Sequence, residues 1–322
     1  MNIIIRKNIL LYILLLFFFF KCAYFNTFYN AEQSFKKAIE IIENSPILDN
    51  GKFPSEAIKF LDKTIKNCNI VIEDYPDSKY IDKAHLLLGI SFFYKQRYDA
   101  SINEFNIIID SNDYEIKNKA ILWSAYSFLK LNEIEKTENY LEKISLDNLN
   151  KDNLYIYYNI RAENDENSQD LDGVYKHYLL ASDITSKSSR KNYIYNKLIK
   201  ISEESNNLLL KTEFIESLEK YTDDSNKLKD LKIEWIESKN KLGQYEDIIS
   251  EIDLIIDDPL FLSIKAQLMI YKAKAYRNSG NNIAAKEILN DIISSFSRKN
   301  ETSSFVYPNA SCNSLILIDK CL

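Results

Sequence analysis

The chain has 322 residues, of which 47 are acidic and 41 basic, for a net charge of −6. This balance argues against nucleic-acid binding, because contact with the phosphate backbone requires a basic surface. Five glycines and five prolines fall well below the ordinary usage of about 7% and 5%, which excludes most strand-rich folds with glycine turns and favours an all-α fold.

Residues 1–21 have the pattern of a signal peptide. Arg6 and Lys7 precede an unbroken apolar run from Ile9 to Phe20. The run is shorter than the roughly 20 residues that span a bilayer, which favours a secretory signal over a permanent membrane helix. An uncleaved membrane anchor is the alternative.

Two helices are predicted next. Apolar residues at Phe35, Ala38 and Ile42 recur at helical spacing and predict a helix that ends near Asn44. The stretch 45–53 contains proline and glycine and breaks it. A second, long helix is predicted from Pro54 to about Glu73, followed by a break at Pro76.

Residues 82–110 read as one pair of helices. Gly89 lets the first helix approach its partner closely, Tyr98 opens the second helix, and Ser101 and Phe105 face back at the first. A third pair follows, with inward residues from Ala120 to Leu129 and then from Ile134 to Ile144. Because such a pair cannot bury its apolar face alone, neighbouring pairs must stack on it.

The middle, residues 146–227, keeps helical spacing but loses the signature of the earlier pairs. Residues 163–169 read as a polar connection, and helices are expected over 189–202 and 206–221. Several residues are predicted to face inward: Tyr155, Tyr158, Tyr175, Tyr178 and Leu179. The segment is interpreted as degenerate repeat rather than as a separate domain.

A clear pattern returns over residues 228–297. Tyr245 and Asn282 occupy equivalent positions 37 residues apart. Asp258 and Pro259 are predicted as the N-cap and first-turn pair of a helix. Residues 298–322 are predicted to be a flexible tail or a cap for the last pair, or alternatively a docking peptide for a partner.

The unit at 82–110 resembles a tetratricopeptide repeat (TPR), whose period is about 34 residues. Gly89, Gly243 and Gly280 fall at signature positions of that repeat. The resemblance implies a right-handed α-solenoid of stacked helix pairs, with N-terminal repeats over 22–145 and C-terminal repeats over 228–297. Such solenoids bind proteins or peptides and are not catalysts.

Cys22, directly after the apolar run, resembles the lipidated cysteine of bacterial lipoproteins, although Lys21 stands where that family prefers a small residue. The residues from Cys22 to Ala31, running on to Phe35, resemble the mature start of bacterial TPR lipoproteins similar in layout to BamD, an outer-membrane-assembly lipoprotein. The resemblance implies a lipid anchor at Cys22 and a position on the outer membrane, facing the periplasm. The partners would be other proteins or peptides, including outer-membrane assembly components.

The sequence shows no catalytic, cofactor or metal motif. His85 and His177 lie among apolar residues at helical spacing and are interpreted as packing residues. Cys68 is interpreted as a core residue. Cys312 and Cys321 lack the further ligands of a zinc site, and either form a disulfide or remain two thiols.

In TPRs the first helix of each pair, called helix A, lines the concave surface of the solenoid. Partner contacts are predicted on helix A residues of this surface. In the best repeat these form an apolar and aromatic group: Lys83, Leu86, Ile90, Phe93 and Tyr94. In the last repeat Lys274, Arg277 and Asn278 would suit an acidic group. The alternative function is glycan binding, as in the SusD group of lipoproteins. A deep polar pocket near Tyr155 to Tyr178 would distinguish a ligand-binding protein or an enzyme from a scaffold.

Overall fold

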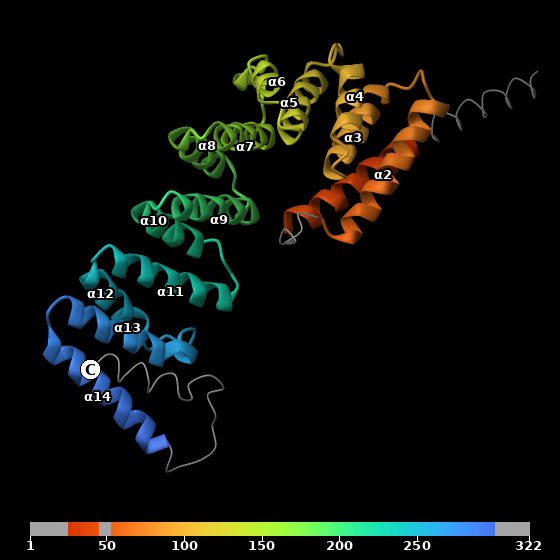
Figure 1. Ribbon diagram of the computed structural model, residues 1–322. Coiled ribbons are helices and arrows are strands. Elements are labelled where there is room, and N and C mark those ends of the chain that lie inside the picture. The colour runs from red at the N-terminus through yellow and green to blue at the C-terminus, as the bar shows by residue number, and fades with distance from the viewer. Residues whose placement is uncertain (1–24, 45–52, 300–322) are drawn as a thin grey trace, which may run out of the picture. The chain divides into compact units, whose positions relative to one another are not determined.

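The computed structural model describes residues 25–44 and 53–299 of the chain. The predicted signal peptide, Cys22, Cys312, Cys321 and nearly all of the predicted tail lie outside the described residues. Within those residues the chain folds into helices and turns, with no strand (Figure 1). None of the described helices has both the length and the apolar character to cross a membrane.

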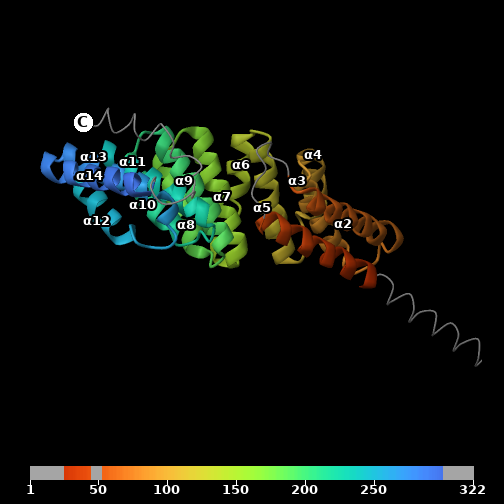
Figure 2. The same ribbon diagram turned by 90° about the horizontal axis from the view of Figure 1, so that it is seen from below.

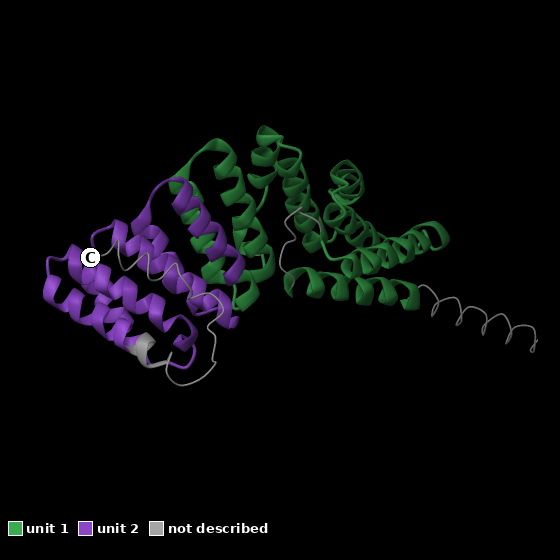
Figure 3. Cartoon of the chain, turned by 60° about the horizontal axis from the view of Figure 1, so that its bottom comes forward, with its two compact units in different colours: residues 1–190 green, residues 191–322 purple. Residues whose placement is uncertain are grey.

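The chain has two compact units, residues 1–190 and 191–322 (Figure 3). The division falls inside the predicted middle segment 146–227. The first unit holds a helix over residues 25–44, here called the first helix, and then α2 (Ser55–Asp74), α3 (Ile81–Tyr94), α4 (Tyr98–Ile108), α5 (Tyr114–Lys130), α6 (Ile134–Leu141), η1 (Leu146–Asn148), α7 (Lys151–Ser168) and α8 (Leu171–Ile184).

The second unit begins within α9 (Ser188–Glu204) and continues through α10 (Leu208–Glu219), α11 (Ser225–Lys241), α12 (Tyr245–Ile255), η2 (Leu262–Ile264), α13 (Lys265–Asn278) and α14 (Asn282–Lys299). In both units, most helices that follow each other in the chain pack on each other. The most extensive contacts are between α7 and α8, α3 and α4, and α13 and α14 (Figure 2). The predicted all-α fold of stacked, TPR-like helix pairs is confirmed.

The same backbone turn joins the two helices of six successive pairs in the described part of the chain. Each turn places one residue in the left-handed region, two positions before the second helix of its pair. Successive positions are 36 or 37 residues apart: Gln96, Asn132, Gln169, Asn206, Gly243 and Gly280. The repeat therefore continues unbroken through the middle of the sequence.

Hydrogen bonding at these turns repeats as well. The amide of Gln96 donates to the carbonyl of Phe93 at 2.8 Å, and the next amide, of Arg97, donates to that of Phe92 at 2.9 Å. The corresponding amides at Gly243 and Gln244 make the same pair of bonds, at 3.2 and 3.0 Å. This Schellman-type arrangement satisfies carbonyls that a helix end leaves without partners. It depends on the backbone and tolerates side chains other than glycine, which is why the sequence signature is lost in the middle while the fold is kept.

Gly89 has a packing role. A Cβ at this position would lie 2.5 Å from Cε1 of Phe105, a fully buried ring on α4. Ser101, also on α4, donates its hydroxyl to the Gly89 carbonyl at 2.8 Å. The predicted close approach of the two helices at Gly89 is thus confirmed, with the ring of Phe105 filling the space that a side chain would need.

The predicted polar connection over 163–169 is wrong. Helix α7 continues to Ser168, and Gln169 is its left-handed C-cap. The polar side chains bond to neighbouring helices and do not lie in a loop: the Tyr126 and Lys130 side chains donate to Glu163, and the Tyr178 hydroxyl donates to Glu166. Polarity in this segment thus reflects contacts between helices.

Two smaller expectations are also corrected. Leu179 was expected to face inward, but it is exposed on α8, while Tyr178 beside it is fully buried. Asp258 does not cap α13, which begins at Lys265. Its carboxylate instead accepts from the amide of Leu260 at 2.8 Å. This contact forms a turn, and η2 is inserted before the helix.

Candidate binding surfaces

The surface predicted on α3 lies mostly inside the first unit. Lys83 is exposed, whereas Leu86, Ile90 and Phe93 are only 6–7% exposed. Their neighbours in the core are Phe105, Ile108, Ile116, Ala120 and Trp123. Phe35 of the first helix packs against the same cluster. The residues expected on an open concave surface are covered because the first helix and α5 close over α3.

Phe93 is the centre of an aromatic cluster in the first unit. Its ring centroid lies 4.5 Å from that of Tyr126, 5.0 Å from that of Trp123 and 5.6 Å from that of Tyr94. Phe53, which precedes α2, contacts Tyr94 edge-on at 5.6 Å. Edge-on and tilted pairs at these distances stabilise a core. These rings pack against one another, so they do not form an open surface on which a ligand could stack.

Tyr94 lies near Glu43, at the end of the first helix, where that helix meets other helices of the unit. Burial and the nearby Glu43 carboxylate raise the pKa of the Tyr94 hydroxyl well above its ordinary range. Glu43 in turn accepts from Lys187 at 2.8 Å and from Arg190 at 2.6 Å. Arg190 also donates to Asp152 on α7, at 2.6 Å. The end of the first helix is therefore held by charged residues at the start of α7 and α9.

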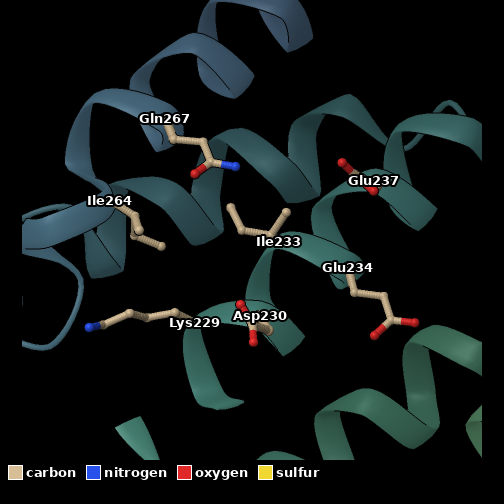
Figure 4. Close-up of a pocket in the computed structure, with 7 residues that line it drawn as sticks. All are labelled: Lys229, Asp230, Ile233, Glu234, Glu237, Ile264 and Gln267. Carbon is tan, nitrogen blue, oxygen red and sulfur yellow. The ribbon is translucent and has the colours of Figure 1, made fainter. Parts of the chain in front are cut away.

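The second unit has an open hollow on the faces of α11 and α13, of about 300 Å³ (Figure 4). Ile233 on α11 and Ile264 at the end of η2 give it an apolar floor. The remaining lining residues are polar: Lys229, Asp230, Glu234, Glu237 and Gln267. Three carboxylates and a single ammonium make the hollow acidic.

Two of these carboxylates are fixed by neighbours. Glu234 accepts from the buried Lys211 at 2.8 Å, and Glu237 accepts from the Tyr271 hydroxyl at 2.6 Å. Burial and the hydrogen bond to Glu237 raise the pKa of Tyr271 to about 12, so that this hydroxyl keeps its proton at neutral pH. Asp230 is exposed at the rim. The hollow thus has one half-buried carboxylate, Glu234, and two exposed ones, Asp230 and Glu237.

The residues predicted to contact a partner on the last repeat, Lys274, Arg277 and Asn278, lie further along α13. Lys274 lies over the ring of Tyr271, with Nζ 5.6 Å from the centroid. Asn278 donates to the Asn240 side chain on α11 at 3.2 Å, and Arg277 is exposed. Tyr271 thus links Lys274 to the hollow, while Asn278 joins the same two helices. Ile233 and Glu237 were not among the predicted contact residues, although both belong to one helical face of α11.

The histidines and Cys68 take positions apart from this hollow. His85 Nδ1 lies 2.7 Å from Glu104, and His177 Nδ1 lies 2.6 Å from Asp165, so both imidazoles are held by carboxylates as well as packed. Cys68 is fully buried, as predicted. Among the described residues no group of His, Cys, Asp and Glu side chains is arranged to hold a metal ion.

The region from Tyr155 to Tyr178, where a deep polar pocket would have pointed to a ligand-binding protein or an enzyme, is packed. Tyr157 belongs to the core cluster shared by α5 and α7, and Tyr178 is fully buried with its hydroxyl 2.5 Å from Glu166. Tyr158 stacks with His177 at a centroid distance of 6.1 Å. These aromatic residues join α7 to its neighbours.

No protein-family model matches the chain, and no curated protein sequence matches it significantly. Several solved structures are similar to it in fold. A tetratricopeptide repeat protein from Parabacteroides merdae aligns over 91% of this chain and 98% of its own, with 10% identity and a TM-score of 0.39. A signal transduction ATPase with a tetratricopeptide repeat sensor, from Pyrococcus horikoshii, aligns over 90% of this chain with 15% identity and a TM-score of 0.42. The alignment spans 49% of the Pyrococcus chain.

Proposed function

We propose that the protein is a non-catalytic scaffold that binds a protein or peptide through the hollow of the second unit. The observation that carries this proposal is the contrast between the two helix A faces. The face predicted on α3 is closed by the protein's own residues, whereas the hollow on α11 and α13 is open and has both an apolar floor and fixed polar groups. Peptide sites combine these two features, since apolar contacts give affinity and placed polar groups give orientation.

The charge of the hollow favours a basic ligand. Asp230 and Glu237 are exposed carboxylates on one face of α11. A lysine or arginine side chain of the partner would meet them at the edge while an apolar side chain covers Ile233. A charged pair at such a rim contributes more to recognition and to the rate of association than to affinity.

The scaffold is anchored to the bacterial envelope through Cys22 and faces the periplasm, where it serves outer-membrane protein assembly or envelope biogenesis. The sequence features that support this part are the apolar run that ends at Phe20 and the cysteine that follows it. A lipidated cysteine with two or more acyl chains would provide stable attachment, whereas one chain gives only reversible binding. The rings around Phe93 do not support the glycan-binding alternative, because they pack on one another.

Site-specific photo-crosslinking in the native host tests the binding site. A benzophenone side chain replaces Ile233 in the hollow or, as the control, Leu254, which is 79% exposed on α12. We expect envelope proteins to be captured from position 233 and not from position 254, and the yield to fall when Asp230→Lys and Glu237→Lys are added. β-Barrel assembly components among the captured proteins would support the assembly role. Equal capture from both positions, or none from position 233, would sink the proposal.

Labelling with radioactive palmitate tests the anchor separately. The native chain is expected to incorporate label and the Cys22→Ser variant to lose it. An unlabelled native chain would refute lipidation and leave the crosslinking result intact.

A further inference from the structure

The start of the first helix carries an aromatic patch, defined here as Phe25, Tyr29, Tyr80 and Lys79. Phe25 stacks on Tyr29 with a centroid distance of 6.3 Å and an interplanar angle of 20°, and it lies 6.3 Å from the ring of Tyr80. The Tyr80 ring stacks on Phe28 at 4.7 Å, and Phe28 is only 3% exposed. The patch is thus fixed to the core of the first unit through Phe28.

Its outer rings are open to solvent. Phe25 is 55% exposed and Tyr29 is 47% exposed. A single exposed apolar side chain is ordinary on a protein surface, but a contiguous group marks an interaction site. Here two exposed rings are stacked on each other, and a third ring carries the ammonium of Lys79, 5.1 Å from its centroid. Core packing does not account for these two exposed rings.

The chemistry of the patch fits the boundary between lipid headgroups and acyl chains. Tyrosine has an apolar ring and a hydroxyl that can remain hydrated, and lysine keeps its charge in water while its stem lies along an apolar surface. Aromatic and basic residues are enriched at this depth for these reasons. Phe25 supplies the purely apolar contact.

The position of the patch in the chain identifies this boundary as its occupant. Phe25 comes three residues after Cys22 and five after the last residue of the apolar run. We infer that the patch of Phe25, Tyr29, Tyr80 and Lys79 lies against the membrane surface and orients the first unit on it. The inference rests on the membrane attachment proposed above, whether that attachment is a lipid or an uncleaved apolar segment, because both would bring residue 25 to the bilayer.

The charges near the patch predict which lipid headgroups are sufficient for its contact with the membrane. Near the patch in the sequence, Glu73, Asp74 and Asp77 are exposed acids, which outnumber the exposed lysines Lys79 and Lys83. Attraction to anionic lipids is therefore not the driving interaction, since that requires clustered basic residues. Contact is expected with zwitterionic phosphatidylcholine alone and should change little with salt.

The test measures how close position 29 lies to the acyl chains. The full chain, purified from host membranes, is reconstituted into phosphatidylcholine vesicles with brominated acyl chains, which quench nearby indoles. Tyr29→Trp introduces the probe, and Ile107→Trp, at a site on α4 that is 60% exposed, is the matched control. Trp123 and Trp235 are 5% and 6% exposed and give the same background in every variant. About half of the emission of the indole at position 29 is expected to be lost, as for aromatic side chains at headgroup depth, with little loss at position 107.

Each outcome decides the inference. Quenching at position 29 alone, in 50 mM as in 500 mM salt, about a threefold change in Debye length, supports it. Quenching at neither position overturns it, and so does equal quenching at both. A benzophenone at position 29 that captures a protein in cells would also overturn it, since the patch would then be a protein interface. Palmitate labelling of Cys22 is scored separately, and a chain without label can still be mixed with the same vesicles, so failure of the anchor and failure of the patch are distinguishable.

Discussion

Arg190 and Glu43 lie 147 residues apart in the sequence, yet Nε and Nη2 of Arg190 both donate to Oε1 of Glu43, at 3.1 and 2.6 Å. The guanidinium is 11% exposed and also lies over the ring of Tyr155, 4.4 Å from its centroid. Burial alone would lower the pKa of Arg190, but the hydrogen bonds and charges of Glu43 and Asp152 outweigh that effect and raise it. This contact joins the end of the first helix to the beginning of α9.

Glu43→Gln should destabilise the first unit by about 1–2 kcal/mol, because the variant loses charge-assisted hydrogen bonds at a partly buried site. Urea unfolding followed by the fluorescence of Trp123, in a Trp235→Phe background, reports on the unit that contains Glu43. The matched control is Lys117→Ala in the same unit, which removes a surface pair with Asp110 at 3.9 Å and should change stability by less than about 0.5 kcal/mol. Equal effects of the two variants would show that the contact adds nothing beyond an ordinary surface pair.

Gly89→Ala should cost about 1–3 kcal/mol, because the added Cβ would meet the ring of Phe105 and force two well-packed helices apart. Phe105→Leu removes ring atoms at that point and should recover part of the loss in the double variant. A double-mutant cycle in urea measures this coupling. Additive losses would contradict the direct contact.

The repeated turn gives a pair of opposite predictions. Gly243 has φ +73° and open space where a Cβ would lie, so Gly243→Ala should cost about 1 kcal/mol through backbone strain alone. Gln169 has φ 60° at the equivalent position, and Gln169→Gly should stabilise by about 0.5–1 kcal/mol. Thermal unfolding of the two variants and the native chain gives the comparison. A loss of stability in Gln169→Gly would mean that its side chain contributes more than the strain costs.

Replacing Lys232 on α11 should lower the stability of the folded protein by an amount that depends on pH. Its ammonium is 9% exposed and contacts Glu219 at 3.0 Å and Glu251 at 2.6 Å. Lys232→Met leaves these carboxylates without their cation and should cost about 2–3 kcal/mol at pH 7. Burial already raises the pKa of Glu219, in spite of the opposing effect of Lys232, so the folded protein takes up this proton more readily than the unfolded chain does.

The sign of the dependence follows from that shift. A carboxyl whose pKa is raised on folding favours the folded state below its unfolded pKa, and this contribution is lost as the pH rises through the folded value. Removal of Lys232 enlarges the shift, so the deficit of Lys232→Met should grow as the pH rises from about 4.5 toward 7. Urea titrations at these two pH values measure it, with Lys200→Met, at a site that is 72% exposed, as the control. A deficit independent of pH would assign the loss to packing.

Cys68 should be inert in the folded protein. Burial, with smaller contributions from Glu104 and Glu32, raises the pKa of its thiol to about 12, so almost none is thiolate at pH 8. Iodoacetamide at pH 8 should therefore leave Cys68 unmodified in buffer and modify it in concentrated urea. Peptide mass spectrometry separates Cys68 from the other cysteines. Rapid modification in buffer would show that the helices around it open readily.

Local patterns in the sequence were enough to predict the all-α class, the helix pairs over 82–110 and 228–297, and the close approach at Gly89. These features depend on local spacing, on glycine and on apolar periodicity, all of which can be read without knowing what lies nearby in space. Local spacing also placed Cys68 in the core, because a small apolar residue on an inward helical face has few other environments.

Which helix faces are open to solvent could not be predicted from local patterns, because it depends on how the helices pack. Leu86, Ile90 and Phe93 lie on a helix A face, but whether that face meets solvent depends on the first helix and α5, which lie far from it in the sequence. The contact of Glu43 with Arg190 and the hollow between α11 and α13 depend likewise on residues from separate helices. The continuous repeat was hidden for a related reason: the left-handed turn at Gln96, Asn132, Gln169 and Asn206 is held by backbone hydrogen bonds, which leave little trace in residue type.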